Sequence, residues 1–330
     1  MTGLAKFSGV VDVVARLAVL AGVFLAFTVV VGPSFASPGN IEGICMQSAV
    51  YVMAGLGMTM IMIAGGIDLA AGSTIALSMV VTSMILKHDG GQNPALWTPL
   101  AVLGGMAAGM LVGMVQGLLI TSLRIVPFII TLGGLVSIRG LTKQIADNQE
   151  ISPPANWLYQ NLMFPVQGRT LNWQLFPIGV WATLVAAVGA GLFLRYTRLG
   201  RRIYAVGSNE STARLCGVPV ERTKILVYAI GGAFAGLAGI LEFSKLNLGQ
   251  PTGAQMYELY IIAACVIGGT SLRGGVGTIF GTVVGALLIG ILNIGAQQAG
   301  WPKQVQEIVI GLIIIAAVAL NQLRGQEKRS

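Results

Sequence analysis

Long apolar runs recur along the whole chain, each about as long as a helix needs to cross a bilayer. A membrane-spanning α-helix requires roughly 20 consecutive, mostly apolar residues. Of the 330 residues, 55% are hydrophobic and only 10% are charged, and the mean hydropathy is +0.79. A water-soluble domain of this size needs more polar surface. The chain is therefore predicted to be an all-α polytopic membrane protein.

About ten transmembrane helices are expected. The predicted spans are residues 14–32, 46–64, 72–87, 99–122, 125–141, 174–194, 224–243, 256–269, 275–297 and 303–322. The first span follows Lys6 and Arg16 and is followed by the letters SFAS, a pattern that also fits a cleavable signal peptide. Because many further spans follow it, we interpret it as a retained first helix.

The uneven distribution of basic residues predicts the orientation of the chain. The segment 195–224 holds seven of the twenty Lys and Arg residues, and Arg324, Lys328 and Arg329 follow the last span. Lys and Arg accumulate in cytoplasmic loops, so both groups are assigned to the cytoplasm, and ten spans put both termini there. Their position at helix ends also argues against nucleic-acid binding, although the net charge is +8.

The longest polar stretch between spans covers about residues 142–173. It contains prolines and several aromatic residues of the kind that lie at membrane–water interfaces. Alternation of the spans assigns this loop to the outer, periplasmic side. The other outward loops are too short for a folded domain, so residues 1–330 are predicted to form a single transmembrane domain.

The cysteines and the histidine do not indicate a metal or redox site. Cys45, Cys216 and Cys265 lie singly and far apart, and His88 is the only histidine. This spacing fits neither a disulfide framework nor a metal-binding motif. No cofactor is therefore expected on this chain.

Two glycine-rich stretches interrupt the apolar pattern. They are MIAGGIDLAAGST, between the second and third spans, and VIGGTSLRGGVGT, after the eighth. A glycine costs about 1 kcal/mol relative to alanine inside a helix, so the helices are predicted to break there. Irregular backbone at membrane depth occurs where it is buried in protein or lines a wet cavity. The candidate pathway residues are Gly65, Gly66, Asp68, Gly72, Ser73, Gly268, Gly269 and, deep in the ninth span, Asn293.

Other glycines are spaced regularly along the chain. The two breaks share the letters GGxxLxxG, at Gly65–Gly72 and at Gly268–Gly275, which either an internal duplication or chance explains, since the chain has 46 glycines. The GxxxG spacings of the fourth and seventh spans predict close packing of helices. They are Gly105–Gly109–Gly113–Gly117 and Gly232–Gly236.

Asp68, in the first break, allows two compatible interpretations. An ionisable residue inside a membrane usually has a functional role, so its carboxylate could face a solute pathway. It could equally cap the third span by accepting N–H groups of the first turn. Arg139 is explained as well by extension to the outer interface as by solute contact. Gln116 and Asn293 are explained as well by interhelical hydrogen bonds.

The sequence lacks the groups that would power transport. No Lys follows a Gly, so there is no phosphate-binding loop of the GxxxxGK[ST] type. The middles of the spans hold few carboxylates and no histidine, which a proton- or sodium-coupled carrier would use to bind its driving ion. We recognise no channel filter motif. The energy for transport is therefore expected to come from another protein.

The polar stretch GSNESTARLCGVPVERTK, residues 207–224, lies between the sixth and seventh spans. Ser208 or Asn209 is suited to cap a short helix. Gly217 is then expected to end that helix, and Pro219 prevents its continuation. A short surface helix held against a membrane domain offers a second protein a place to bind. The alternative is a plain basic connecting loop.

Four stretches resemble the permease subunits of bacterial ABC importers of the ribose, xylose, arabinose and galactose type. They are GGIDLAAGS, VPFIITLGGLVSIRGL, YAVGSNESTARLCGVPVERTKILVYAIGGAFAGLAGIL and ACVIGGTSLRGGVGTIFGTVVGALLIGIL, in the family's order. The resemblance extends from about Gly43 to Leu320. It implies the fold of a type II ABC importer permease and a location in the bacterial inner membrane.

In this family a short cytoplasmic helix docks into a groove of the ATPase subunit. The resemblance transfers this role to Asn209, Glu210, Ser211, Thr212, Ala213, Arg214 and Gly217. The usual Glu-Ala-Ala-x-x-x-Gly pattern is only partly kept, because Ser211 and Thr212 occupy its first two positions and Glu210 lies one residue early. Ala70 and Ala71 also replace the usual Ser-Val after the first break.

The resemblance implies a translocation subunit that passes a monosaccharide or similar polyol by alternating access and is not itself an enzyme. The implied partners are a second permease subunit, identical or not, cytoplasmic ATP-binding chains that hold ATP and Mg²⁺, and a periplasmic sugar-binding protein. The alternatives are a branched-chain amino-acid or nucleoside ABC permease and an ATP-independent carrier or channel.

Overall fold

The computed structural model describes residues 2–165, 175–309, 311, 312 and 315, and every regular element among them is helical. The elements are α1 (Thr2–Val31), η1 (Pro33–Ala36), α2 (Pro38–Ile63), α3 (Ala71–Asp89), α4 (Pro94–Leu123), α5 (Pro127–Ile145), η2 (Leu158–Leu162), α6 (Ile178–Tyr196), α7 (Arg198–Ser208), α8 (Glu210–Leu215), α9 (Val220–Leu246), α10 (Tyr257–Ile267) and α11 (Ile279–Gln298). Residues 303–309 are also helical.

Six of the described helices are long and apolar enough to cross a bilayer: α1, α2, α4, α6, α9 and α11. The fold is therefore a helical polytopic membrane protein, as predicted. Helix length and composition do not by themselves establish the expected count of about ten. The remaining predicted spans correspond to α3, α5, the short α10 and the helix at residues 303–309, and part of the last predicted span lies outside the described residues.

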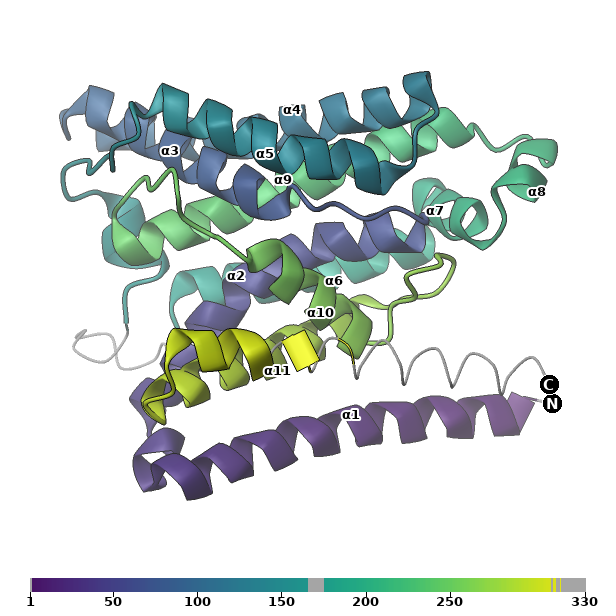
Figure 1. Ribbon diagram of the computed structural model, residues 1–330, viewed down its shortest axis with the longest axis horizontal. Helices are drawn as coiled ribbons and strands as arrows, with labels where there is room; N and C mark the ends of the chain where they lie inside the picture. Colours follow the sequence, from purple (N-terminus) through teal and green to yellow (C-terminus); the bar gives the residue numbers. More distant parts are fainter. Residues whose placement is uncertain (1, 166–174, 310, 313–314, 316–330) are drawn as a thin grey trace.

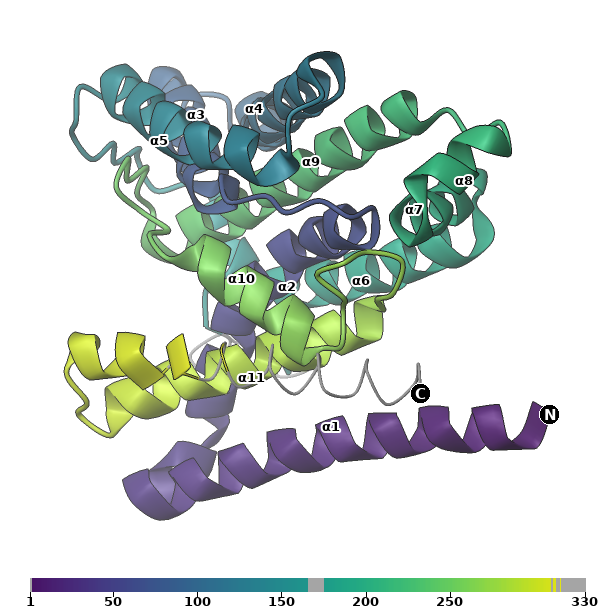
Figure 2. The same ribbon diagram turned by 45° about the vertical axis from the view of Figure 1, so that its right-hand side comes forward.

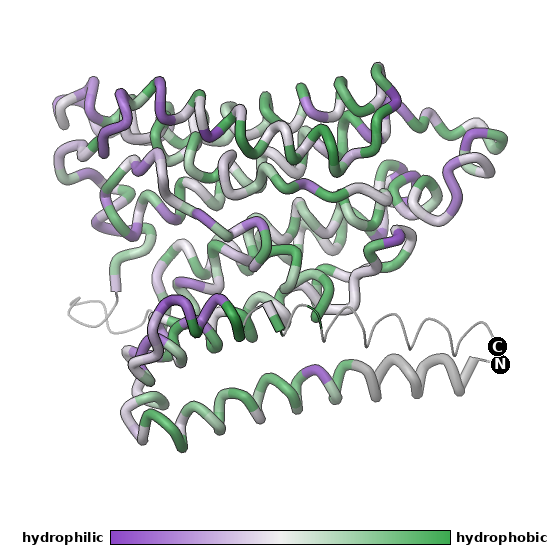
Figure 3. The backbone as a smooth tube through the Cα atoms, in the orientation of Figure 1, coloured by the Kyte–Doolittle hydropathy of each residue, from purple (hydrophilic) through white to green (hydrophobic). Residues whose placement is uncertain are grey.

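The helices form a bundle around α2. In the most apolar stretch of α2, 83% of the residues are buried. The corresponding share is 72% in α11, 67% in α9 and 6% in α1. A helix that is apolar all round belongs in the interior of such a bundle, and α2 lies there, whereas α1 runs along one edge (Figure 1). The hydrophilic residues gather mainly at the two ends of the bundle (Figure 3).

The predicted close packing through glycines is confirmed for α4 and α9. A Cβ on Gly109 would overlap the carbonyl oxygen of Gly232, and one on Gly113 would overlap that of Tyr228. A Cβ on Gly236 would lie 2.8 Å from the carbonyl oxygen of Gly105. The two backbones therefore touch along this seam, which only glycine permits.

Both predicted helix breaks are present. α2 ends at Ile63 and α3 begins at Ala71, while α10 ends at Ile267 and α11 begins at Ile279. Figure 1 shows the first link running back from the end of α2 toward the middle of the bundle, where α3 begins. α10 likewise begins in the middle of the bundle (Figure 1). These two helices therefore start at depth rather than at a surface.

The two breaks use the same turn but in a different sequence register. The N–H groups of Ala64, Gly65 and Gly66 bond to Met60, Met62 and Ile61. Those of Gly268, Gly269 and Thr270 bond to Ala264, Val266 and Cys265 in the same pattern. The left-handed residue is Gly65 (φ 84°) in the first break and Gly269 (φ 88°) in the second, a common way to end a helix. The shared letters GGxxLxxG pair Gly65 with Gly268 instead, so that match is out of register by one residue.

Candidate functional site

One candidate site is α8, at the end of the bundle that we call the α8 end; the opposite end is the far end (Figures 1 and 2). Asn209 is the N-cap, and its side-chain oxygen accepts the N–H of Thr212 at 2.9 Å and the Ser211 hydroxyl at 2.7 Å. Gly217, two residues after the last residue of α8, adopts φ 78°, which explains the need for glycine there. The sequence prediction of a capped short helix is confirmed, with Asn209 rather than Ser208 as the cap.

The side chains of α8 divide into a buried and an exposed group. Ala213 is buried and packs with Val206 of α7 and Val220 of α9. Leu215 is 89% exposed, an unusual position for a large apolar side chain on a polar segment. Leu215 is thus the large apolar side chain that α8 exposes, whereas Ala213 packs the helix onto the bundle.

Ion pairs attach α8 to the start of α9. The Arg214 guanidinium lies 2.6 Å from the Glu221 carboxylate and 3.5 Å from that of Glu210, and the Lys224 ammonium lies 2.7 Å from Glu210. The pKa of Glu221 is lowered, first by its own backbone N–H and then by Arg214. The pKa of Arg214 is raised, mainly by Glu221. Glu210 therefore serves this network within the chain.

The second candidate site is the first break, which is buried inside the bundle. Asp68 is 3% exposed, and its carboxylate accepts the N–H of Ala70 at 2.9 Å, directly before α3. The carbonyl oxygen of Ile67 accepts the Thr131 hydroxyl at 3.1 Å and the Tyr228 hydroxyl at 3.3 Å. Side chains of α5 and α9 thus donate hydrogen bonds to a buried carbonyl oxygen that lies outside any helix. A buried carbonyl needs such a partner within the protein because no water reaches it.

The first turns of α3 and α10 meet in the interior. A Cβ on Gly72 would overlap the carboxylate of Glu258, in the first turn of α10. The Arg139 guanidinium, from α5, donates to the carbonyl oxygens of Pro251 at 3.1 Å and Gly253 at 2.5 Å, just before α10. Broken helices that begin near mid-membrane form the solute sites of several transporter folds. This meeting point is the candidate pathway position.

Other pathway candidates have different partners. The Ser73 hydroxyl donates to the carbonyl oxygen of Leu135 at 2.7 Å and so joins α3 to α5. A Cβ on Gly268 would overlap the carbonyl group of Gly281, so this glycine permits contact between the break and α11. The position of a Cβ on Gly269 lies 2.5 Å from the Arg16 guanidinium of α1. The structure brings Asp68 and Gly72 together, but not Ser73 or the second break, at the meeting point.

Asn293 lies apart from the breaks, beside a polar cluster that the sequence analysis missed. Its amide donates to the Tyr51 hydroxyl at 3.2 Å, and the Tyr51 ring contacts the Tyr257 ring edge-on at 5.1 Å. Tyr257 and three further side chains close a ring of hydrogen bonds: Gln47 donates to Tyr257, Tyr257 donates to Glu242, and Lys245 donates to both Glu242 and Gln47. Asn293 therefore bonds between helices, one of its two predicted roles.

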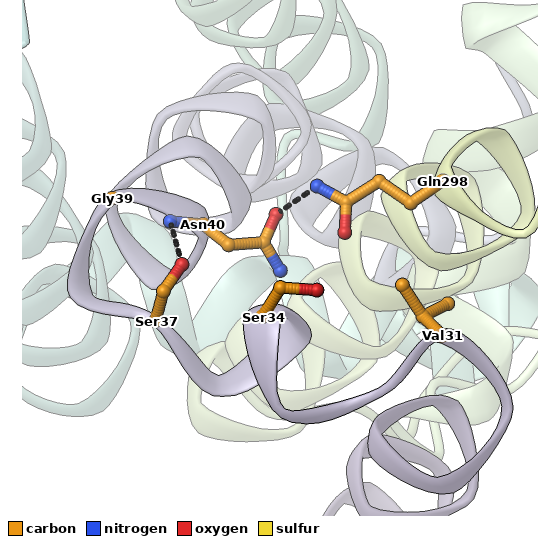
Figure 4. A pocket seen from close by; sticks show the side chains of 6 residues that line it. All are labelled: Val31, Ser34, Ser37, Gly39, Asn40 and Gln298. Atoms are coloured by element: carbon orange, nitrogen blue, oxygen red, sulfur yellow. Dashed lines mark hydrogen bonds between the residues drawn. The ribbon is translucent and has the colours of Figure 1, made fainter.

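The far end carries an open depression (Figure 4). Its lining residues are Val31, Ser34, Ser37, Gly39, Asn40 and Gln298. The Gln298 amide donates to the Asn40 side-chain oxygen at 2.5 Å, and the Asn40 amide donates to the carbonyl oxygen of Phe35 at 2.6 Å. Scattered neutral residues of this kind give no sequence signal, so the depression could not be predicted from the sequence.

The described residues contain no group of three or more His, Cys, Asp or Glu side chains placed to hold a metal ion. What they do contain is a bundle of apolar helices with buried backbone breaks and a capped helix exposed at one end. Broken helices that are buried inside a helical bundle are typical of polytopic membrane transport proteins.

Comparison with known proteins agrees with this class. The chain belongs to the family described as branched-chain amino acid transport system / permease component, whose model matches residues 40–318. It is 38% identical over 322 residues to the ribose import permease protein RbsC of Bacillus subtilis (strain 168), covering 97% of this chain and 95% of that one.

Two further relatives have similar coverage. RbsC of Escherichia coli (strain K12), also a ribose import permease protein, is 37% identical over 303 residues, 91% of this chain and 90% of that one. The L-arabinose transport system permease protein AraH of the same strain is 34% identical over 325 residues, 98% of this chain and 95% of that one. No solved structure matches the chain.

Proposed function

We propose that this chain is the translocation subunit of an ATP-binding-cassette importer that passes a monosaccharide or similar polyol across the bacterial inner membrane. The observation that carries this proposal is the near full-length similarity to permeases named for ribose and L-arabinose.

In this proposal α3, α5, α10 and the helix that starts at residue 303 complete about ten crossings. The segment 195–224 and both termini then lie in the cytoplasm, and the loop 142–173 lies in the periplasm. The seven basic residues of segment 195–224 support this orientation. The whole chain acts as one domain, with the meeting point of α3 and α10 on the solute pathway.

The proposal assigns the energy source to a partner. ATP and Mg²⁺ bind to cytoplasmic ATP-binding chains, one of which docks on α8, and a periplasmic sugar-binding protein delivers the solute at the far end. Two permease subunits, identical or related, enclose the pathway. Binding of the loaded binding protein and ATP favours one packing of the helices, and hydrolysis restores the other, which is alternating access by population shift.

The exposed leucine of α8 provides a test of ATPase docking. Leu215→Asp places a charge where the partner would bury an apolar side chain, and losing the burial of a leucine, about 1.5–3 kcal/mol, weakens association about tenfold or more. The matched control is Leu96→Asp, since Leu96 is 59% exposed at the far end. We expect the ATP-binding subunit to co-purify with Leu96→Asp and not with Leu215→Asp; equal co-purification would exclude docking through α8.

The solute class is tested in proteoliposomes that contain the permease, its ATP-binding subunit and its binding protein. We expect ATP-dependent uptake of labelled ribose, arabinose or galactose, and none of labelled leucine. Leucine uptake instead would favour the second candidate, a branched-chain amino-acid permease, which the family description names. Solute flux through the purified chain alone would show an ATP-independent carrier or channel.

A further inference from the structure

α7 touches the end of α2 through a close backbone contact. Gly207, near the last turn of α7, lies against the carbonyl oxygen of Ile63, the last residue of α2, and a Cβ on Gly207 would overlap that oxygen. The helix that precedes α8 therefore rests directly on the point where the first break begins.

The second break reaches the same point. The N–H of Gly275 donates to the carbonyl oxygen of Ile63 at 2.8 Å. A Cβ on Gly274 would lie 2.7 Å from the carbonyl oxygen of Gly207 and 3.0 Å from the Cα of Gly65. We call the contact of Ile63, Gly65, Gly207, Gly274 and Gly275 the three-way junction.

One side chain reinforces the junction. The Tyr204 hydroxyl, from α7, donates to the carbonyl oxygen of Gly277 at 2.8 Å. Figures 1 and 2 both show α7 beside the end of α2 and beside the loop between α10 and α11. α7 is thus hydrogen-bonded to the second break and packed against the first.

The junction is suited to transmit a displacement. Its glycines bring three backbones into direct contact, with no flexible side chain between them to absorb a movement, and close-packed interiors transmit strain in this way. Asn209 is the only residue between α7 and α8, and Ala213 of α8 packs with Val206 of α7. A movement of α8 therefore moves α7.

We propose that the three-way junction is the link through which α8 acts on both helix breaks at once. The first break leads into the start of α3, and α10 ends in the second, so a push on α7 is delivered to both helices that meet in the interior. Gly207 and Tyr204 are then positioning residues for transport, since they act through the breaks and touch no solute. This proposal rests on the proposed function.

Tyr204→Phe tests the proposal with little risk to folding. It removes one hydrogen bond between α7 and the second break, whose net value corresponds to about a fivefold change in an equilibrium. In the reconstituted complex we expect sugar transported per ATP hydrolysed to fall by up to about fivefold, with co-purification of the ATP-binding subunit unchanged. The matched control is Tyr196→Phe, since Tyr196 is 64% exposed just before α7.

Gly207→Ala tests the backbone contact, and Gly109→Ala, on the seam of α4 and α9, is its steric control. Both introduce a clash with a backbone carbonyl, so both lower the yield of folded complex. We expect only Gly207→Ala to lower the sugar transported per ATP in the complex that remains. The proposal is overturned if Gly207→Ala and Tyr204→Phe both keep the wild-type ratio. A wild-type complex that moves no sugar with ATP would instead refute the proposed function.

Discussion

At the scale of single residues, Gly66 gives a prediction about stability. It distinguishes a steric clash from the loss of the backbone flexibility of glycine. A Cβ there would overlap the Tyr228 hydroxyl, which donates to Ile67 at 3.3 Å. Gly66→Ala forces this hydroxyl aside, and overpacking of a dense interior costs about 1–3 kcal/mol. We expect a fall of several degrees in the midpoint of thermal unfolding in detergent.

Two further variants identify the cause of this effect. In Gly66→Ala/Tyr228→Phe the obstructing hydroxyl is absent, so part of the lost stability should return. In Gly191→Ala, on α6, a Cβ meets nothing within 4 Å, and a helical alanine is favoured over glycine by about 1 kcal/mol. Its midpoint should not fall. A Gly66→Ala protein as stable as wild type, or no recovery in the double variant, would contradict the described packing.

Individual residues also show the limit of sequence analysis. Asn209 and Gly217 were predictable because capping and a left-handed end depend on a few neighbouring residues. Asp68 was expected at the first turn of α3, and its carboxylate binds the N–H of Ala70, immediately before that turn. The burial of Ala213 was not predictable, because it depends on how α7 and α9 pack around it.

At the scale of elements, the attachment of α8 to α9 gives a prediction about pH. The lowered pKa of Glu221 means that its interactions stabilise the folded arrangement above the ordinary carboxyl pKa of about 4.3. This contribution is lost as the pH falls through the lower, folded-state pKa. A nitroxide on Cys216, which is exposed at the end of α8, should therefore become more mobile only in acid, below about pH 4.

Glu221→Gln should give this higher nitroxide mobility already at neutral pH, because it removes the charge that pairs with Arg214. Electron paramagnetic resonance measures it in a Cys45→Ser background, which leaves Cys216 as the accessible thiol. Glu150→Gln, at an exposed carboxylate that bonds Gln250, is the control and should change nothing. Unchanged mobility in Glu221→Gln would show that the Arg214–Glu221 ion pair does not hold α8.

Among the elements, the long helices were predictable from their apolar composition. The breaks were predictable from the free-energy cost of glycine inside a helix. α7 was missed as a separate helix, although Gly200, Ile203 and Val206 form a buried stripe at helical spacing that an amphipathic pattern could have revealed. The GGxxLxxG match was misleading for a physical reason. Both breaks end a helix with the same turn, and the glycine that the turn requires is the first of the pair in one break and the second in the other.

At the scale of the whole molecule, the sequence predicted polar ends and an apolar middle, because the bilayer imposes that pattern on every span. It did not predict which segments meet at the α8 end. Ile63, Gly207 and Gly275 are far apart in the chain and meet through backbone atoms, so no pattern of side chains marks the contact. Gly72 and Glu258 are likewise far apart in the chain, and the Glu258 carboxylate lies against Gly72 in the interior.

The proposed orientation predicts which end of the molecule faces each side of the membrane. A charged maleimide that cannot cross a bilayer should label Gln92→Cys, exposed in the turn between α3 and α4 at the far end, in right-side-out vesicles. It should label Cys216 of α8 only in inverted vesicles, with Cys45→Ser as the background. The reason is the concentration of Lys and Arg around α8, which disfavours its translocation.

Detergent-solubilised protein, in which both thiols should react, is the control for accessibility. Labelling of both positions from one side would mean that the helices between them do not carry the chain across the membrane in the proposed way. Labelling of Cys216 only from the outside would reverse the orientation. Since ATP is hydrolysed in the cytoplasm, that result would remove α8 from the ATP-binding subunit, and the three-way junction would have no partner to act on it.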